Sequence, residues 1–192
     1  AKDNSKFHIS QGTNRMARIA ITGHSAGIGQ AFAKIYQDRG HEVVGLSRRN
    51  GYNIRNLAKC LEQIKPCDIF INNAQVGFAQ TELLFAVYEA WQGVTGKRII
   101  NISTLMTSLP SSCLPGLDML QYHVQKTTLE EAIRQLRGLQ DWPKLCLVKP
   151  GKTDTQGHGG VNVTVWANKI LETIDTYPYM EVEELSIGEY LT

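Results

Sequence analysis

Two residues in a helix-like segment have the types and spacing that acid–base chemistry needs. Tyr122 and Lys126 are four residues apart, which places both side chains on one face of a helix. A free phenol has a pKa of about 10 and is a poor proton donor or acceptor at neutral pH. A neighbouring ammonium group favours the phenolate and lowers that pKa. The pair is therefore a candidate proton-exchange site, although the same spacing also occurs on ordinary helix surfaces.

A glycine-rich turn near the start of the chain is a candidate phosphate site. Residues 22–29 read T-G-H-S-A-G-I-G, between an apolar segment and a helical pattern. Gly23 can adopt backbone angles that a Cβ forbids. Gly27 lets a pyrophosphate approach the main chain, and Gly29 lets the helix lie close to the strand. Because the free N–H groups of the helix then face the anion, the turn predicts nucleotide binding, with a purely structural turn as the alternative.

Basic residues follow the second apolar segment, where an NAD site usually has an acid. The segment ends in Ser47, Arg48 and Arg49, whereas NAD sites place a carboxylate on the ribose hydroxyls at this point. A contact between a guanidinium group and a phosphate contributes on the order of 1.5–3 kcal/mol. That is about tenfold or more in affinity, so we expect NADP to be preferred over NAD. A solvated basic turn is the alternative interpretation.

Four motifs together resemble the short-chain dehydrogenase/reductase family. They are the T-G-x-x-x-G-x-G turn, Asn-Asn-Ala at 72–74, Y-x-x-x-K at 122–126 and P-G-x-x-x-T at 150–155, in the family's order. The resemblance implies an NAD(P)-dependent oxidoreductase of the carbonyl reductase or alcohol dehydrogenase type, which transfers a hydride between nicotinamide and a carbonyl or alcohol substrate. The stretch 74–104 is markedly shorter than in typical members, so we expect a shortened member.

The resemblance also implies a role for each motif residue. Tyr122 would exchange the proton, and Lys126 would lower its pKa and hold the nicotinamide ribose. Alignment on the apolar segment 98–102 assigns the hydroxyl that binds the substrate oxygen to Thr104, with Ser103 as the alternative. The residues expected to bind the cofactor are Gly23, Ser25, Gly27, Ile28, Gly29, Arg48, Arg49, Asn53, Ile54, Asn73, Ala74, Tyr122, Lys126, Pro150, Gly151, Thr153 and Thr155.

Departures from the family pattern support a second class of function. Gln75 replaces the glycine that follows Asn-Asn-Ala in the family. The asparagine that the family uses on its central helix to hold a water is not identifiable. A catalytically weak or inactive dinucleotide-binding sensor or scaffold is therefore the alternative, and the retained tyrosine–lysine pair argues against it. Nucleic-acid binding through Arg48, Arg49 and Arg55 is a third possibility, which a formal net charge of only +2 disfavours.

Length and composition fit one globular domain. The chain has 192 residues, of which 42% are hydrophobic, enough for one sizeable core. Residues 1–15 are polar and aperiodic, so we expect an extension or cloning remnant there and the NAD(P)-binding domain at 16–192. No apolar run approaches the roughly 20 residues of a membrane span.

The cysteines indicate neither a disulfide framework nor a metal site. Cys60, Cys67, Cys113 and Cys146 are scattered without a C-x-x-C pair, which is typical of reduced thiols in a cytoplasmic protein.

The expected partners follow from the family resemblance. They are a small carbonyl or alcohol substrate and further copies of the chain in a homodimer or homotetramer. We expect no metal, nucleic acid or membrane partner.

Strand and helix patterns alternate along the chain. Expected strands lie at 18–21, 42–47, 67–71, 97–102 and 145–148, with an edge strand within 179–187, and expected helices at 29–36, 56–64, 82–91, 122–136 and 163–174. Apolar runs without alternation suit a parallel sheet that is covered on both faces. The fold class is therefore α/β, a doubly wound parallel sheet of Rossmann type in one domain, with ligands at the carboxyl ends of its strands.

Overall fold

A parallel sheet forms the centre of the molecule. The computed structural model describes residues 16–113, 116–139, 141–155, 159–176 and 182–188, so the expected extension at 1–15 lies outside the described residues. Within the described ranges the sheet has six strands in the order β2-β1-β3-β4-β5-β8, all paired in parallel. The strands are β1 (Arg18–Thr22), β2 (Glu42–Leu46), β3 (Ile69–Asn72), β4 (Arg98–Ile102), β5 (Lys144–Pro150) and β8 (Glu184–Ile187).

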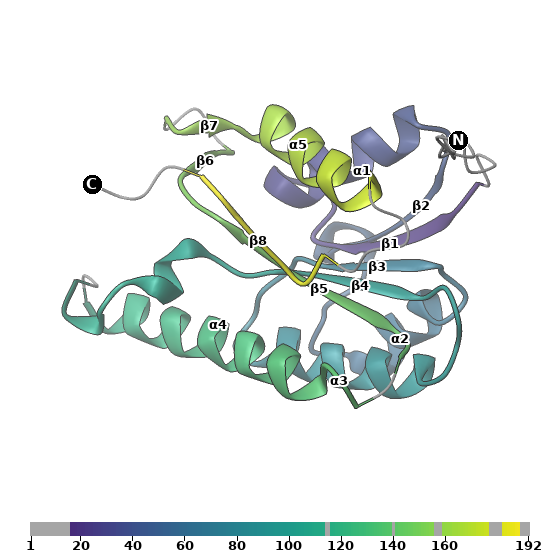
Figure 1. Cartoon of the computed structure of the whole chain (residues 1–192), viewed down its shortest axis with the longest axis horizontal. Helices are drawn as coiled ribbons and strands as arrows, with labels where there is room; N and C mark the ends of the chain where they lie inside the picture. The colour runs from purple at the N-terminus through teal and green to yellow at the C-terminus, as the bar shows by residue number, and fades with distance from the viewer. Residues whose placement is uncertain (1–15, 114–115, 140, 156–158, 177–181, 189–192) are drawn as a thin grey trace, which may run out of the picture.

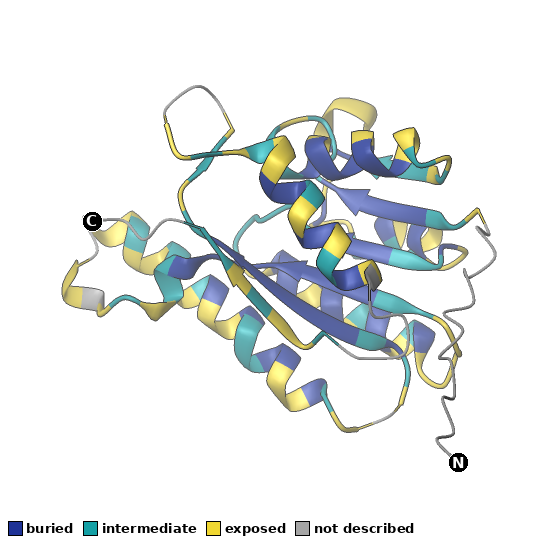
Figure 2. Ribbon diagram, turned by 45° about the horizontal axis from the view of Figure 1, so that its top comes forward, coloured by how far each residue is buried: buried dark blue, intermediate teal, exposed yellow. Residues whose placement is uncertain are grey.

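Helices cover both faces of this sheet. On one face lie α1 (Gly27–Asp38) and α5 (Val163–Thr176), and on the other lie α2 (Leu57–Ile64), α3 (Ala79–Trp91) and α4 (Gly116–Leu136) (Figure 1). Two buried apolar clusters fill the layers between sheet and helices. The strands are buried along most of their length, and the helices turn their buried sides to them (Figure 2). The predicted doubly wound α/β fold of one domain is therefore confirmed.

The order of the strands creates a crevice at the carboxyl edge of the sheet. The chain passes from β1 outward to β2 and returns to β3 on the other side of β1. The turns that follow β1 and β3 therefore run in opposite directions, and in open α/β sheets ligands bind at such a switch point. Smaller elements lie near this edge: the 3-10 turns η1 (Arg48–Asn50), η2 (Leu105–Ser108) and η3 (Ser111–Cys113), and the short strands β6 (Thr153–Asp154) and β7 (Val161–Asn162).

The boundaries of several elements differ from those expected. Helix α4 begins at Gly116 rather than at residue 122. The sequence did not reveal its first turn, because residues there such as Leu117 are exposed and form no buried stripe. Strand β3 begins at Ile69 rather than at residue 67. The N–H group of Cys67 still donates to Ile64 O in the turn that ends α2, so pairing with β1 starts later.

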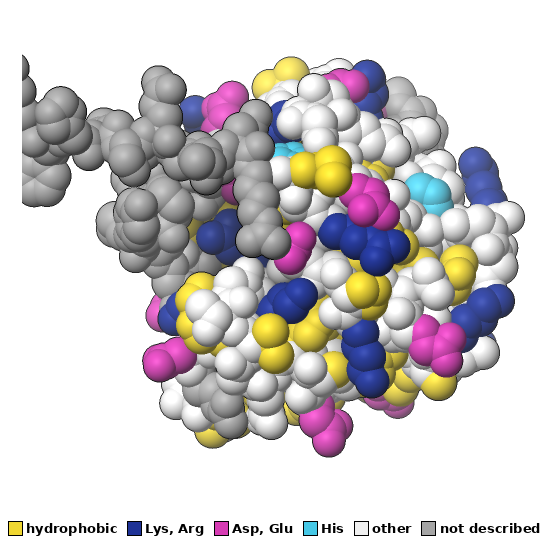
Figure 3. All heavy atoms as spheres, turned by 90° about the vertical axis from the view of Figure 1, so that its right-hand side faces the viewer, with side chains coloured by type: hydrophobic (Ala, Val, Ile, Leu, Met, Phe, Trp, Pro, Cys, Tyr) yellow, Lys and Arg dark blue, Asp and Glu magenta, His cyan; other side chains and the backbone are white. Residues whose placement is uncertain are grey.

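The opposite edge of the sheet carries mixed charges. On the described part of the face in Figure 3, basic and acidic side chains are interspersed with apolar ones. An exposed ion pair joins β1 and β2 there, between Arg18 Nε and Glu42 Oε1 at 2.8 Å. Among the helices in the described ranges, none is both long and apolar enough to cross a membrane.

Candidate functional site

The glycine turn after β1 has the backbone geometry of an anion cradle. Gly23 and Gly27 have φ angles of 71° and 55°, in the left-handed region that favours glycine. Gly29 has no room for a side chain, because a Cβ there would lie 2.4 Å from the carbonyl oxygen of Gly23 and 2.7 Å from Asn73 Nδ2. The N-terminus of α1 can therefore approach the turn closely and direct its free N–H groups toward the crevice.

A hydrogen-bonded clasp joins this turn to the end of β3. The hydroxyl of Thr22 accepts hydrogen bonds from the N–H groups of Asn73 and Ala74, both at 3.0 Å. The side-chain amide of Asn73 donates back to Thr22 O at 2.9 Å. Asn73, predicted as a cofactor contact, thus also holds the two carboxyl ends of β1 and β3 together.

A cavity of about 300 Å³ opens beside the clasp. Seven of the predicted cofactor residues line it, namely Gly23, Ser25, Arg48, Arg49, Asn53, Ile54 and Ala74, together with Ala26, Leu46, Ser47, Tyr52, Gln75 and Val76. The side chains of Arg48 and Arg49 are exposed, and neither forms an ion pair with another described residue. The cavity therefore offers two guanidinium groups to an anion.

Three further predicted cofactor residues, Ile28, Thr153 and Thr155, are not part of the cavity lining and have other contacts. Ile28 turns its side chain to the core on the α1 face, which leaves its backbone for any cofactor contact. Thr155 lies opposite the glycine turn, since a Cβ on Gly27 would meet its side chain at 3.5 Å. The Thr153 hydroxyl donates to Gly151 O at 3.1 Å and so shapes the turn after β5.

The predicted catalytic residues meet at the carboxyl end of β4. Lys126 on α4 is only 3% exposed, and its Nζ donates to Gln80 Oε1 at 2.9 Å and to Ile102 O at 2.8 Å. The same Nζ lies 5.7 Å from the centre of the Tyr122 ring. The side chain of Thr104 lies beside the Tyr122 phenol, close enough to lower its pKa. The structure thus brings together Tyr122, Lys126 and Thr104.

The two candidate hydroxyls point to different partners. Thr104 meets Tyr122, whereas the Ser103 hydroxyl donates to Glu130 Oε1. Successive side chains alternate across an extended chain, and Thr104 has extended backbone angles of φ −159° and ψ 147°. Of the two hydroxyls, only that of Thr104 is therefore in contact with the tyrosine.

Burial dominates the titration of both catalytic groups. Burial lowers the pKa of Lys126 to about 7, against the opposing effect of the Glu130 carboxylate. Burial raises the pKa of Tyr122, and the neighbouring Thr104 side chain opposes this rise. The expectation that Lys126 lowers the pKa of Tyr122 is not met in this structure, because the ammonium group is directed at Gln80 and the Ile102 carbonyl and is itself poorly solvated.

Sequence reasoning missed Gln80, a buried residue in the first turn of α3. Its Nε2 donates to Asn72 O at 2.7 Å and Ile102 O at 3.0 Å, while its Oε1 accepts from Lys126. Gln80 thus lies on α3. The asparagine that the family uses on its central helix to hold a water was not identifiable in the sequence. A polar residue on the apolar side of α3 was the available signal, but the predicted helix began at 82 and excluded it.

Gln75, which replaces a family glycine, extends toward the catalytic helix. Its Nε2 donates to Gln125 Oε1 on α4 and to Gly77 O at 3.5 Å. The loop after β3 and helix α4 are therefore in contact beside the catalytic residues. Within the described part of the chain, no group of three or more His, Cys, Asp or Glu side chains could hold a metal ion.

Comparison with known proteins shows similarity in structure alone. No protein-family model and no curated protein matches this sequence. The structure is similar to a short chain dehydrogenase from Burkholderia cenocepacia J2315 in complex with NADP, with a TM-score of 0.74 and 17% identity over 92% of this chain and 90% of that chain.

Two further solved structures agree with this similarity. An alcohol dehydrogenase from Thermococcus sibiricus complexed with 5-hydroxy-NADP has a TM-score of 0.71 and 16% identity, covering 91% of this chain and 97% of that chain. The 3-alpha-hydroxysteroid dehydrogenase from Pseudomonas sp. B-0831 complexed with NADH has a TM-score of 0.69 and 17% identity, covering 89% and 95%. The chain therefore has the fold of the short-chain dehydrogenases/reductases, which confirms the resemblance that its motifs predict.

Proposed function

We propose that the protein is an NAD(P)-dependent oxidoreductase that interconverts a carbonyl compound and an alcohol. The observation that carries the proposal is the meeting of Tyr122, Thr104 and the buried Lys126 at the carboxyl edge of the sheet. A buried lysine is costly unless its charge is used or compensated, and strongly perturbed titrating groups gather at functional sites. Similar structures in complex with NADP or NADH support the same proposal.

The residues around the crevice fit a dinucleotide. Gly23 and Gly27 have left-handed angles, and Gly29 has no space for a Cβ where α1 packs against the turn; both features are typical of a turn that binds a pyrophosphate. Arg48 and Arg49 border the cavity, and none of the described residues that line it is acidic. They would hold a 2′-phosphate, so we propose NADP as the preferred cofactor. When bound, the nicotinamide ring supplies or accepts the hydride.

The chain's own groups handle the oxygen and its proton. With its pKa raised by burial, the Tyr122 phenol is protonated at neutral pH and can give its proton to a carbonyl oxygen. In the reverse direction the phenolate accepts the proton of an alcohol. The Thr104 hydroxyl is a second donor for the same oxygen, where it stabilises developing negative charge. Lys126 Nζ lies 5.7 Å from the centre of the Tyr122 ring, and its role would be to hold the nicotinamide ribose, as the family resemblance implies, rather than to set the pKa of Tyr122.

Cofactor binding is tested by titration with NADPH and NADH, followed by nicotinamide fluorescence. We expect the wild type to bind NADPH about tenfold or more tightly than NADH, as one charge-assisted phosphate contact implies. Arg48→Ala should remove most of that difference. Arg55→Ala is the matched control, because Arg55 is exposed nearby but does not line the cavity. Equal affinities in the wild type would refute the NADP preference.

A dinucleotide-binding sensor or scaffold is the second candidate, and the Gln75–Gln125 contact favours it. This contact spans the loop after β3 and the catalytic helix at the edge of the site. The two candidates differ in turnover: an enzyme loses carbonyl reduction in Tyr122→Phe while it retains NADPH binding. A sensor binds NADPH equally in both forms and reduces no carbonyl compound in either.

A further inference from the structure

A largely buried ion pair lies close to the catalytic residues, and the function proposed above does not yet assign it a role. Lys149 Nζ on β5 is 3.0 Å from Glu130 Oε2 on α4, and the two side chains are 9% and 18% exposed. Burying two charges is unfavourable unless their remaining hydrogen-bonding capacity is also satisfied. The partners that satisfy it therefore indicate what the pair holds in place.

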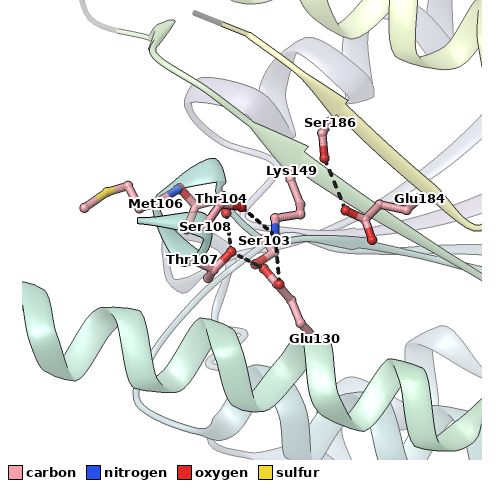
Figure 4. Close-up of polar contacts among 9 residues, drawn as sticks. All are labelled: Ser103, Thr104, Met106, Thr107, Ser108, Glu130, Lys149, Glu184 and Ser186. Atoms are coloured by element: carbon pink, nitrogen blue, oxygen red, sulfur yellow. Dashed lines mark hydrogen bonds and ion pairs between the residues drawn. The ribbon is translucent and has the colours of Figure 1, made fainter. Parts of the chain in front are cut away.

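Those partners all come from residues 103–108, between β4 and η3. The hydroxyl of Ser103 donates to Glu130 Oε1, and the Thr107 hydroxyl lies 2.7 Å from the same oxygen. Lys149 Nζ donates to Ser108 Oγ at 3.3 Å. The two charged residues thus contact both ends of the 103–108 segment, as Figure 4 shows.

The same segment carries Thr104. The Thr107 hydroxyl lies 2.8 Å from Thr104 O as well as 2.7 Å from Glu130 Oε1, and it can donate its single proton to one of them at a time. The Thr104 hydroxyl accepts from Met106 N at 3.3 Å. The Thr107 side chain therefore lies between the Glu130 carboxylate and the backbone of Thr104 and can bond to either.

Helix α4 presents Glu130 and the catalytic pair, Tyr122 and Lys126, on one side. Tyr122, Lys126 and Glu130 follow one another at intervals of four residues, so their side chains lie in one row on the helix. All three contact the end of β4 or the segment that follows it. The row places a carboxylate one turn beyond the catalytic lysine, where it also favours the charged form of Lys126.

We propose that Glu130 is a positioning residue for the reaction proposed above: it holds the 103–108 segment so that the Thr104 hydroxyl stays against the Tyr122 phenol. Lys149 compensates the charge of Glu130 and anchors the far end of the segment. The inference rests on the proposed function for its catalytic consequence. Its structural part concerns residues 103–108 and can be measured without turnover.

The catalytic part is tested by a double-mutant cycle with NADPH and a carbonyl substrate. Glu130→Ala should lower kcat about tenfold to a hundredfold, since small misplacement of a reacting group has effects of this order, and should leave the KM for NADPH within about twofold. In a Thr104→Ala background the same change should have a much smaller effect, because Glu130 acts mainly through Thr104. If Glu130→Ala lowers kcat by the same factor in the wild type and in the Thr104→Ala background, Glu130 does not act through Thr104 and the proposal is wrong.

Two variants separate positioning from general loss of structure. Glu131→Ala is the matched control, because Glu131 is the next residue on α4 and pairs with Arg134 instead of the segment. The double variant Glu130→Gln/Lys149→Met removes both charges without leaving either one unpaired and keeps an acceptor oxygen for Ser103 and Thr107. We expect this double variant to retain more kcat than Glu130→Ala; a kcat equal to or below that of Glu130→Ala contradicts the proposal.

Amide hydrogen exchange tests the structural part directly. The N–H group of Leu109 donates to Met106 O at 3.0 Å and that of Thr107 to Thr104 O at 3.4 Å. In Glu130→Ala these two amides should exchange at least tenfold faster, with exchange in β4 unchanged, while Glu131→Ala leaves all of them unchanged. Unaltered exchange at Thr107 and Leu109 overturns the inference whether or not the protein is an enzyme. Faster exchange in a protein that reduces no carbonyl compound supports the structural role and refutes the proposed function.

Discussion

Replacing Lys126 with methionine should change how stability depends on pH. Lys126 is almost completely buried, and burial lowers its pKa from 10.5 to about 7. In the unfolded chain the amine is solvated and regains its ordinary pKa. Between these two values the folded state binds fewer protons than the unfolded state. The free energy of unfolding of the wild type, relative to Lys126→Met, therefore rises as the pH rises through this window.

The size of the effect follows from the difference between the two pKa values. Linkage gives a slope of up to about 1.4 kcal/mol per pH unit inside the window, and the integrated gain between pH 7 and pH 9 is about 2 kcal/mol. Below the lower pKa both states are protonated and the relative stability becomes constant. The loss of hydrogen bonds to Gln80 and Ile102 in the variant adds an offset that does not depend on pH in this range.

The measurement is urea denaturation at several pH values, followed by the fluorescence of the buried Trp91 and Trp166. Only the difference between the two proteins is interpreted, because other buried groups titrate in both. Burial raises the pKa of Cys67 to about 11, for example, and this destabilises the wild type and the variant equally at high pH. If the free energy of unfolding of the wild type relative to Lys126→Met stays constant or falls between pH 7 and pH 9, the conclusion that Lys126 is buried and poorly solvated is wrong.

Two further predictions concern the crevice at the end of β1. Thr22→Val should lower the free energy of unfolding by about 1–3 kcal/mol, because the N–H groups of Asn73 and Ala74 lose their acceptor; urea denaturation measures this, and an unchanged midpoint would contradict the clasp. Gly29→Ala should weaken NADPH binding at least tenfold in a fluorescence titration, because its Cβ would lie 2.4 Å from Gly23 O and the turn must shift. Wild-type affinity in this variant would show that the turn does not form the phosphate site.

The fold was predictable because its main signals are local. Segments such as Ile-Phe-Ile at 69–71 are apolar without alternation, as is typical of strands covered on both faces. The glycine turn and the motif at 150–155 both follow strands, so their place at one edge of the sheet follows from parallel topology. The start of α4 was missed because its exposed first turn contains no buried stripe for periodicity to detect.

The candidate site was predictable only where its residues are spaced along one element. Tyr122 and Lys126 share a helix, so their spacing identifies the pair. Gln80 and Glu130 have partners far away in the sequence: Lys126 is 46 residues from Gln80, and Ser103 is 27 residues from Glu130. Such contacts depend on how the sheet and helices pack. The direction of the Tyr122 pKa was missed for the same reason, because burial is a property of the assembled fold.

The most direct test of the proposed function is transfer of a labelled hydride. The protein is incubated with NADPH deuterated at the transferred position and a panel of aldehydes and ketones, and the products are analysed by mass spectrometry. The proposal predicts an alcohol with deuterium on the former carbonyl carbon for at least one compound, and loss of that product in Tyr122→Phe with NADPH binding retained. Absence of labelled alcohol from the wild type, or equal yields from wild type and Tyr122→Phe, would contradict it.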